Sequence, residues 1–436
     1  MRKFLPPGLM ALAALLALPG LAHAEVDAET AYVLNTFSFL VNGALVMWMA
    51  AGFAMLEAGM VRTKSVATIC LKNVVLFAIA GIAYYLIGYR LMYDGVDGGF
   101  IGSIGLWGAS DGGVEEGVFE GYATSSDWFF QMVFVATAAS IVSGAVAERI
   151  KLWSFLAFTA VLTAVIYPIE GAWQWGGGWL SEMGFYDFAG STIVHSTGGW
   201  AALTGVLILG ARRGKYGGKG EIRLMAPSSL PLATLGTFIL WLGWFGFNGG
   251  SQLALGSAGD AVAMANIYAN TCVAAMGGVV VAAVATQLIY RKVDLTMVLN
   301  GALAGLVSIT AGPDTPGLGG AILIGGVGAA IVMIGVPLLD RLKIDDVVGA
   351  IPVHLFAGIW GTMAVPFTNA DTSFVTQGIG VLAIGAFVAV ASAIVWMLIK
   401  VTVGLRVSAE DEETGLDRVE LGISAYPEFS RDSVAV

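Results

Sequence analysis

The chain has 436 residues, of which 57% are hydrophobic and only 12% are charged, and its formal net charge is −10. An average soluble domain carries about 25% charged residues, so this chain has too few charges to cover a water-facing surface. The composition excludes a soluble enzyme, a nucleic-acid-binding protein and a disordered chain, and it indicates a polytopic membrane protein. Cys70 and Cys272 both lie in apolar runs, so the sequence indicates neither a disulfide framework nor a cysteine metal site.

Residues 1–24 have the pattern of a secretory signal peptide. Arg2 and Lys3 form a basic start, residues 9–18 form a short apolar run, and the AHA triplet at residues 22–24 fits a small-residue cleavage site. The alternative is a first membrane anchor, but the apolar run is short for that role. We therefore predict that the peptide is cleaved, which places the new N-terminus outside the cytoplasm.

From residue 25 onward, apolar segments of about 20 residues recur, and each is long enough to cross about 30 Å of hydrocarbon. They predict an all-α polytopic membrane protein with a transmembrane domain at residues 25–405 and a cytoplasmic tail at residues 406–436. The eleven expected helices lie near residues 32–56, 66–93, 128–146, 152–169, 192–209, 230–247, 263–290, 296–310, 318–339, 347–367 and 379–403.

Basic residues give the orientation of these helices. Lys and Arg cluster in alternate loops, and the opposite loops are acidic. The basic clusters are Arg62/Lys64, Arg149/Lys151, Arg212 to Arg223, Arg291/Lys292, Arg341/Lys343 and Lys400/Arg406. Because cytoplasmic loops retain Lys and Arg, this pattern predicts an inner-membrane protein with its N-terminus in the periplasm and its C-terminus in the cytoplasm.

The odd number of expected helices suggests two sets of five helices followed by one additional helix. Five crossings reverse the direction of the chain, so the second set of five would be inverted relative to the first, as in many transporters. The halves would cover about residues 30–210 and 228–368, with the eleventh helix at 379–403. The two histidines that remain after cleavage, His195 and His354, fall in corresponding spans of the two halves.

His195 and His354 are the main candidates for function. A polar side chain inside an apolar span is costly unless it has a partner or faces a cavity, and it indicates function by default. A facing pair of imidazoles could share a proton along a dry pore, since each neutral ring offers one donor and one acceptor. Interhelical hydrogen bonding is the plainer alternative, and a metal site is disfavoured because no third ligand is near.

Aromatic and acidic side chains mark the outer ends of the spans. An aromatic belt at the membrane interface accounts for most of these aromatic residues, although their faces also attract small cations. The aromatic residues are Trp128, Phe129, Phe130, Phe134, Trp173, Trp175, Trp241, Trp244, Phe245 and Phe247. Asp187 could cap the fifth span, fix the field for an entering cation, or do both. Glu57 and Glu148 are expected to pair with nearby Arg and Lys.

Four motifs together resemble the ammonium transporter (Amt/Mep/Rh) family, in its bacterial Amt form. They are GAVAERI at residues 144–150, DFAGSTIVH at 187–195, GWFGFNGGS at 243–251 and VHLFAGIWG at 353–361. The resemblance runs from about residue 30 to 405. It implies eleven helices in two inverted halves, a homotrimer with one pore per subunit, ammonium or methylammonium as substrate, nitrogen uptake as the role, and no cofactor.

The resemblance also implies roles for particular residues. Trp175 and Ser251 match the outer recruitment site for ammonium, with Phe130 beside it. Asp187 matches the acidic residue required near that site. Phe134 and Phe247 match the stacked pair that blocks the pore. His195 and His354 match the two histidines that line it. On this basis the cation would be deprotonated near the phenylalanines, and ammonia would pass along the histidines.

Some positions depart from the family pattern. Pro352 lies two residues before His354, where a kink would change the angle of the imidazole, and Leu355 replaces a small residue. The tail keeps GLD and AY but not the stretch between them, so regulation by a cytosolic PII-type protein is an open expectation. The alternatives are an ammonium sensor with little flux and an Rh-like channel for neutral gases. An enzyme is disfavoured because no nucleophile–base pair accompanies the histidines.

Overall fold

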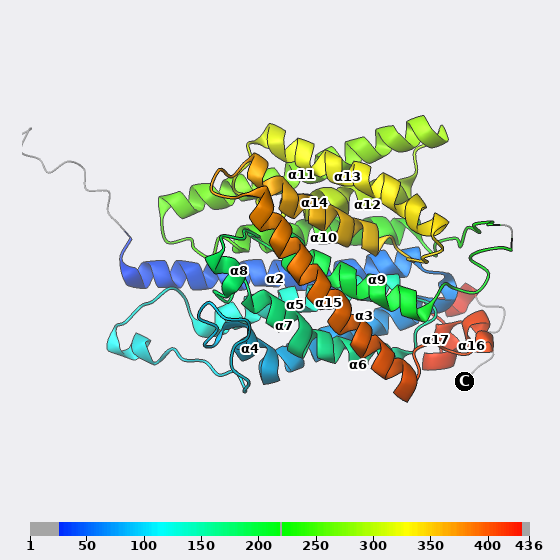
Figure 1. The fold of residues 1–436 in the computed structure, drawn as a ribbon, viewed down its shortest axis with the longest axis horizontal. Helices are drawn as coiled ribbons and strands as arrows, with labels where there is room; N and C mark the ends of the chain where they lie inside the picture. Colours follow the sequence, from blue (N-terminus) through cyan, green and yellow to red (C-terminus); the bar gives the residue numbers. More distant parts are fainter. Residues whose placement is uncertain (1–25, 219, 430–436) are drawn as a thin grey trace, which may run out of the picture.

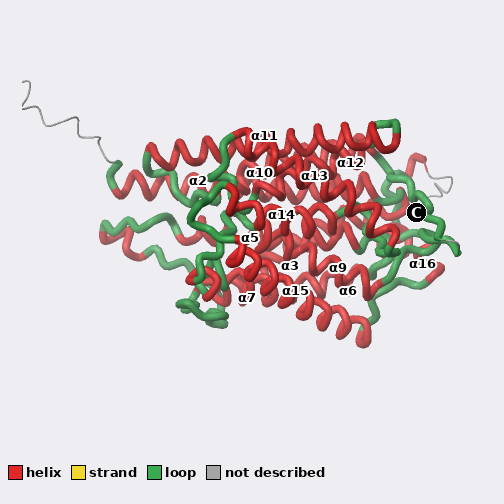
Figure 2. The backbone as a smooth tube through the Cα atoms, turned by 45° about the horizontal axis from the view of Figure 1, so that its top comes forward, coloured by secondary structure: helices red, strands yellow, loops and turns green. Residues whose placement is uncertain are grey.

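The computed structural model describes residues 26–218 and 220–429. The signal peptide predicted for residues 1–24 therefore lies outside the described residues. Within these ranges the chain is helical apart from its loops and two isolated β-bridges, which confirms the all-α prediction. The long helices lie side by side along the long axis of the molecule (Figures 1 and 2).

Nine helical stretches in the described residues are long and apolar enough to cross a membrane. They are Ala28–Met60, Thr63–Tyr93, Thr124–Ala145, Leu152–Ala172, Ser191–Leu209, Leu230–Gly250, Ala258–Tyr290, Leu318–Arg341 and Phe374–Thr402. Two shorter apolar helices, Leu295–Ile309 and Ile351–Phe367, lie where the eighth and tenth spans were predicted. Every predicted span thus corresponds to a helix, although two of them are shorter than the usual length for a crossing.

Several of these stretches are composite. The uninterrupted helices are α2 (Ala28–Met60), α5 (Thr124–Ala145), α10 (Leu230–Gly250), α11 (Ala258–Tyr290), α12 (Leu295–Ile309), α13 (Leu318–Arg341) and α15 (Phe374–Thr402). The others join α3 (Val66–Ala83) to α4 (Tyr89–Tyr93), α6 (Leu152–Val161) to α7 (Tyr167–Ala172), η5 (Ser191–Ser196) to α9 (Thr197–Leu209), and η6 (Ile351–Phe356) to α14 (Ala357–Ala364). Short helices α8 (Trp179–Glu182), α16 (Ala409–Thr414) and α17 (Leu416–Leu421) lie in the loops and the tail.

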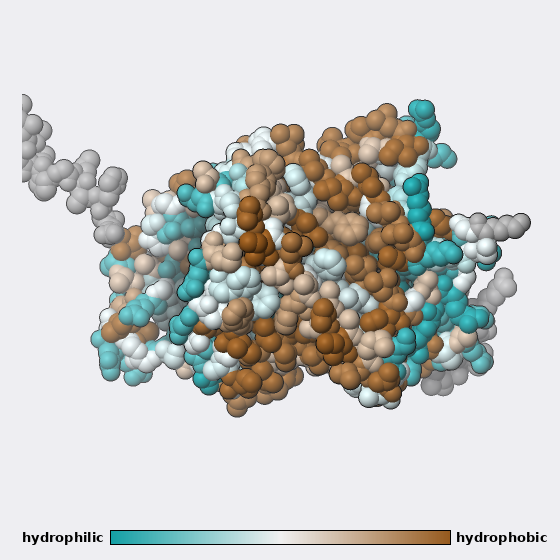
Figure 3. All heavy atoms as spheres, in the orientation of Figure 1, coloured by the Kyte–Doolittle hydropathy of each residue, from teal (hydrophilic) through white to brown (hydrophobic). Residues whose placement is uncertain are grey.

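Apolar side chains cover the middle of the outer surface, and polar ones gather at its two ends (Figure 3). On α15, for example, Val375, Leu382 and Val390 are each more than 60% exposed. In water such a surface would be unfavourable, whereas in a bilayer it needs no partner. The distribution therefore supports the membrane location predicted from the composition.

Helices α2 and α10 approach each other closely because glycines line their contact. A Cβ atom at Gly236 would lie 2.3 Å from the backbone nitrogen of Leu56, and one at Gly59 would lie 2.4 Å from that of Ala233. Small residues permit such backbone contact, which supplies packing energy that the hydrophobic effect does not supply between helices in lipid. These two helices are the first spans of the two predicted halves.

One end of the bundle, which we call the basic end, is held by a buried network of charges. The guanidinium of Arg212 contacts Asp345 at 2.8 Å and Glu148 at 3.0 Å, and Glu148 also pairs with Arg62. Burial alone would raise the pKa of Asp345, but hydrogen bonds and positive charge from Arg212 hold that pKa well below its usual range. The expected pairing of Glu148 with nearby arginines is therefore confirmed.

The tail folds back onto the basic end. The carboxylate of Asp417 accepts hydrogen bonds from the backbone N–H groups of Ala67 and Thr68, at 3.0 and 2.8 Å, and so caps the start of α3. Lys64 donates to two tail carbonyls, those of Glu412 and Glu413. This segment is thus packed against the helices rather than extended away from them.

Replacing Gly236 by Ala is expected to lower the stability of the bundle by about 1–3 kcal/mol, because the new methyl group collides with the backbone of α2. Gly378→Ala on α15 is the matched control, since a Cβ atom there meets nothing within 4 Å. Thermal unfolding of both variants in detergent measures the difference. Equal melting temperatures for the two variants would contradict the close contact.

Replacing Arg212 by Met should destabilise the protein by about 3–5 kcal/mol, because the buried carboxylate of Asp345 loses its ion-pair partner and Glu148 keeps only Arg62. The neighbouring Arg213 provides the control, since its side chain is 53% exposed and reaches Glu413 at 3.4 Å. Arg213→Met should cost about 0–1 kcal/mol. Denaturation monitored by tryptophan fluorescence tests this ordering, and a comparable loss in both variants would refute it.

Candidate functional site

A cavity of about 440 Å³ lies near the end of the bundle opposite the basic end. Four of the residues singled out from the sequence line it together: Phe130, Phe134, Trp175 and Ser251. The rest of its wall is largely aromatic and polar, with Tyr89, Tyr93, Tyr122, Asp127, Gln131, Gln174, Phe188 and Leu253. We call this cavity the vestibule. Its aromatic faces and hydroxyl groups suit a small cation.

Asp127 is a vestibule residue that the sequence analysis missed. Its carboxylate is buried, accepts a hydrogen bond from the hydroxyl of Tyr89, and accepts another from Gln131 Nε2 at 3.1 Å. The available signal was an acidic residue in the first turn of the third span, directly before the aromatic run at residues 128–130. A buried negative charge beside an aromatic cavity increases its attraction for cations.

Two stacked phenylalanines form the floor of the vestibule. The rings of Phe134 and Phe247 lie 4.0 Å apart between centroids, and both side chains are about 1% exposed or less. Phe130 packs on Phe134 at 4.8 Å. The hydroxyl of Ser251 donates to the carbonyl of Phe247 at 2.8 Å, so its oxygen lone pairs remain able to accept from a ligand.

The two histidines meet directly below this floor. His195 Nδ1 lies 3.2 Å from His354 Nδ1, and the centroids of the imidazoles are 5.2 Å apart. For neutral rings this contact requires one Nδ1 to donate and the other to accept, so the pair must hold two different tautomers. Nε2 of His195 has no hydrogen-bond partner among the described residues.

Trp244 belongs to the site rather than to an interfacial belt, which corrects the reading of the sequence for this residue. Its ring stacks on His195 at 4.9 Å, its side chain is fully buried, and its Nε1 donates to Thr310 Oγ1 at 2.8 Å. His195 also stacks on Phe247 at 5.3 Å. The stack of aromatic rings therefore fixes the plane of one imidazole.

Asp187 caps the helix that carries His195. Its carboxylate accepts hydrogen bonds from the backbone N–H groups of Gly190, Ser191, Thr192 and Ile193, at 2.8–3.1 Å. Its own carbonyl accepts from Trp175 Nε1 at 2.9 Å, so Asp187 also holds the vestibule indole. Asp187 was expected to cap the fifth span, to fix the field for an entering cation, or to do both. The hydrogen bonds are direct evidence that it caps the helix.

The segment that carries His354 has a similar arrangement. Asp346 accepts from the backbone N–H groups of Gly349 and Ile351, at 3.1 and 2.7 Å, and thereby caps η6. Both glycines that follow these aspartates have positive φ, +102° at Gly190 and +81° at Gly349. The sequence carries the signal as Asp-x-x-Gly-x-x-x-Val-His at residues 187–195 and at 346–354, a repeat that the sequence analysis did not notice.

Pro352 does not kink a helix as expected. The tenth span begins at Ile351 rather than near residue 347, so Pro352 occupies the first turn, where its missing N–H would have no partner in the helix anyway. His195 and His354 both lie in π-helical turns, η5 and η6. Such turns are rare and occur frequently at functional sites.

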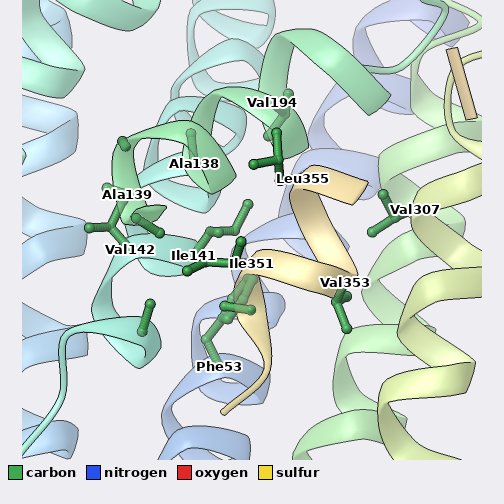
Figure 4. Packing of buried hydrophobic residues seen from close by; sticks show 14 of the residues in the cluster. Phe53, Ala138, Ala139, Ile141, Val142, Val194, Val307, Ile351, Val353 and Leu355 are labelled. Carbon is green, nitrogen blue, oxygen red and sulfur yellow. The ribbon is translucent and has the colours of Figure 1, made fainter. Parts of the chain in front are cut away.

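Beyond the histidines, toward the basic end, lies a small cavity of about 20 Å³. We call it the inner cavity. His354 and Glu57 both border it, and much of the remaining wall is apolar. Three of its apolar residues, Phe53 from α2, Ile141 from α5 and Val353 from η6, are labelled among the buried hydrophobic side chains in Figure 4. Within the described residues, no group of three or more His, Cys, Asp or Glu side chains is placed to hold a metal ion.

Comparison with known proteins gives a consistent result. Residues 37–426 match the model of the Ammonium Transporter Family. The ammonium transporter Amt2 of Archaeoglobus fulgidus is 42% identical over 424 residues, covering 89% of this chain and 87% of that protein. A solved structure named Sensor Amt Protein superposes with a TM-score of 0.84 at 33% identity, covering 91% of this chain and 100% of the other. Mep2 of Candida albicans superposes with a TM-score of 0.77 at 25% identity, covering 94% of each chain.

Replacing Asp187 by Ala is expected to destabilise the protein by about 3 kcal/mol or more, because several buried N–H groups lose a charged acceptor. Asp371→Ala, at an exposed loop position, is the control and should change stability by less than about 0.5 kcal/mol. Thermal unfolding in detergent measures both variants. An unchanged melting temperature for Asp187→Ala would show that the cap does not hold the helix.

Proposed function

The chain belongs to the ammonium transporter family, and from this premise we propose that it conducts ammonium as ammonia through a pore lined by His195 and His354. The homologues are named as transporters, and the protein is not an enzyme. The observation that carries the proposal is the consecutive arrangement of two cavities and two pairs of side chains. The vestibule, the phenylalanine pair, the histidine pair and the inner cavity follow one another through the bundle.

The vestibule recruits the cation. Ammonium rests between the indole face of Trp175 and the hydroxyl of Ser251, with Phe130 beside it. A cation over an aromatic ring gains about 0.5–2 kcal/mol, depending on how far it is desolvated. The buried carboxylate of Asp127 adds a favourable field, and Asp187 holds Trp175 in place through its backbone carbonyl. Methylammonium carries the same charge and N–H donors and is expected to enter by the same route.

The phenylalanine pair selects the species that passes. An uncompensated ion in an apolar passage faces a desolvation penalty of up to tens of kcal/mol, whereas a neutral molecule does not. Ammonium can avoid the penalty by releasing a proton, and potassium cannot. Phe134 and Phe247 therefore act as a gate at which ammonium is deprotonated, so that ammonia enters the pore as a neutral molecule and the proton crosses separately from it.

The histidine pair provides the polar line within the apolar pore. Ammonia donates to or accepts from the free ring nitrogens, because the two Nδ1 atoms are occupied by each other. The same shared hydrogen bond offers a route for the released proton. Asp187 and Asp346 position the two imidazoles by capping the helices on which they lie.

The protein is proposed to cross the inner membrane eleven times. Two inverted halves at about residues 30–210 and 228–368 and a last helix at 379–403 fit the repeated Asp–Gly–His spacing, since the capping aspartates lie at opposite ends of the pore. The N-terminus would face the periplasm after cleavage of residues 1–24, and the tail from residue 406 would face the cytoplasm. A homotrimer, nitrogen uptake and control by a PII-type protein remain proposals from family resemblance.

A sensor with little flux is the second candidate, and one observation favours it. The solved structure named Sensor Amt Protein is matched over its whole length. The two functions differ in one measurable quantity, the ammonium flux per protein in liposomes. An Rh-like gas channel differs in another respect, since its flux would not depend on membrane potential.

Proteoliposomes on a solid-supported membrane should give an ammonium-dependent current that potassium does not produce. His354→Leu is expected to lower that current by about tenfold or more, equivalent to about 1.4 kcal/mol in the barrier, because an apolar side chain breaks the polar line. Met333→Leu, a buried change of similar volume on α13, is the control. Full current and selectivity in His354→Leu would refute the role of the histidines, and absence of current in the unmodified protein would favour the sensor.

A further inference from the structure

The side chain of Glu57 is buried on α2 without the ionic partner expected for it. It is 1% exposed, and none of the ion pairs found among the described residues includes it. Its Oε2 atom accepts a hydrogen bond from the hydroxyl of Ser143 at 2.6 Å, and the side chain of Asn73 lies close to the carboxyl group. No hydrogen bond to Oε1 is formed within the described chain. A buried carboxyl oxygen without a hydrogen bond is costly, so this position indicates a ligand or a transferable proton.

Lys72 on α3 supplies a positive charge behind this carboxyl. It is 2% exposed, and its Nζ donates to the backbone carbonyl of Ser143 at 2.8 Å. Nζ also lies 4.7 Å from the ring centre of Phe155. Ser143 therefore bridges the two groups, with its hydroxyl on Glu57 and its carbonyl on Lys72. The other titratable groups that face Glu57 are Cys70 from α3 and His354 from η6.

Glu57 and His354 border the same inner cavity. Its volume of about 20 Å³ accommodates one molecule of the size of water or ammonia. The ring of Phe53 lies 6.2 Å from that of His354, and Glu57 is four residues further along α2, about one helical turn. A molecule that leaves the histidine pair toward the basic end therefore enters a cavity whose polar wall is formed by Ser140, Asn300 and Glu57, and Glu57 carries the one carboxyl group among these lining residues.

We propose that Glu57 is the proton-transfer residue at the inner end of the pore. Its carboxylate takes a proton from a ring N–H of His354, so that this N–H bond breaks and an O–H bond forms on Oε1, while the other ring nitrogen of His354 takes a proton from His195 through their shared hydrogen bond and the ring stays neutral. The O–H bond then breaks as a fourth N–H bond forms on ammonia, which leaves ammonium and a carboxylate. One proton is received and one is given, and the charge of Lys72 stabilises the carboxylate between transfers.

This inference rests on the proposed function, in which neutral ammonia travels along the histidines. It adds a partner for the proton at the end where ammonia must become ammonium again. It also accounts for a lysine buried in an apolar bundle, since a charge there is costly unless it serves a neighbouring group.

The test uses the full-length protein in proteoliposomes on a solid-supported membrane. Glu57→Gln keeps the shape and can still accept from Ser143, but it cannot carry the proton, so the ammonium-driven current should fall about tenfold or more. Glu410→Gln, an exposed carboxyl on the tail, is the matched control and should keep the current of the unmodified protein. Unchanged current in Glu57→Gln would overturn the proposal.

A second variant covers the case in which Glu57→Gln does not fold. Glu57→Asp retains a carboxyl group further from the cavity, so it should keep a reduced current whose pH dependence and D₂O sensitivity both change. A pH profile and D₂O effect identical to those of the unmodified protein would overturn the proposal. Absence of ammonium current in the unmodified protein would instead refute the proposed function itself, so the two failures are distinguishable.

Discussion

Every polar group in an apolar bundle must be satisfied from within, and this constraint governs the positions of both histidines. A helix that starts inside the bundle leaves N–H groups without partners, and water is not available to them. Asp187 and Asp346 supply the missing acceptors, and the glycines that follow them turn the chain into each helix. Each histidine lies eight residues after its aspartate, so the same caps bring the two imidazoles to 3.2 Å.

Much of this arrangement could be predicted from the sequence. Composition and apolar runs predict a multi-pass helical protein, and four of the eight candidate residues line one vestibule. Of the other four, Phe247 stacks on Phe134, His195 and His354 contact each other, and Asp187 caps the helix that carries His195. The short tenth helix was harder to place, because hydropathy does not distinguish a capped loop from a helical turn. The start of that helix is marked by the hydrogen bond that Asp346 accepts from the backbone N–H of Ile351, which the sequence pattern does not reveal.

What the sequence could not provide is which polar residues share a cavity. Asp127 and Glu57 lie in unremarkable positions near helix ends, and nothing in their spacing predicts that one lines the vestibule and the other the inner cavity. Trp244 was assigned to a membrane belt because interfacial position and stacking on His195 give the same sequence signal. Only the packing of separate helices distinguishes these alternatives, and packing depends on glycine contacts such as Gly236 against Leu56.

Two acidic residues lie on either side of the aromatic and imidazole segment, Asp127 in the vestibule and Glu57 in the inner cavity. Asp127 lies before the phenylalanine pair and Glu57 beyond the histidine pair, so an apolar passage with only imidazoles in it separates two carboxyl groups. A positive charge is stabilised near either carboxyl and disfavoured between them, because the aromatic wall offers no counter-charge there. Under the proposed function, discrimination against permanent ions therefore requires only the segment around Phe134, Phe247 and the imidazoles, and the remainder of the path can be polar without loss of selectivity.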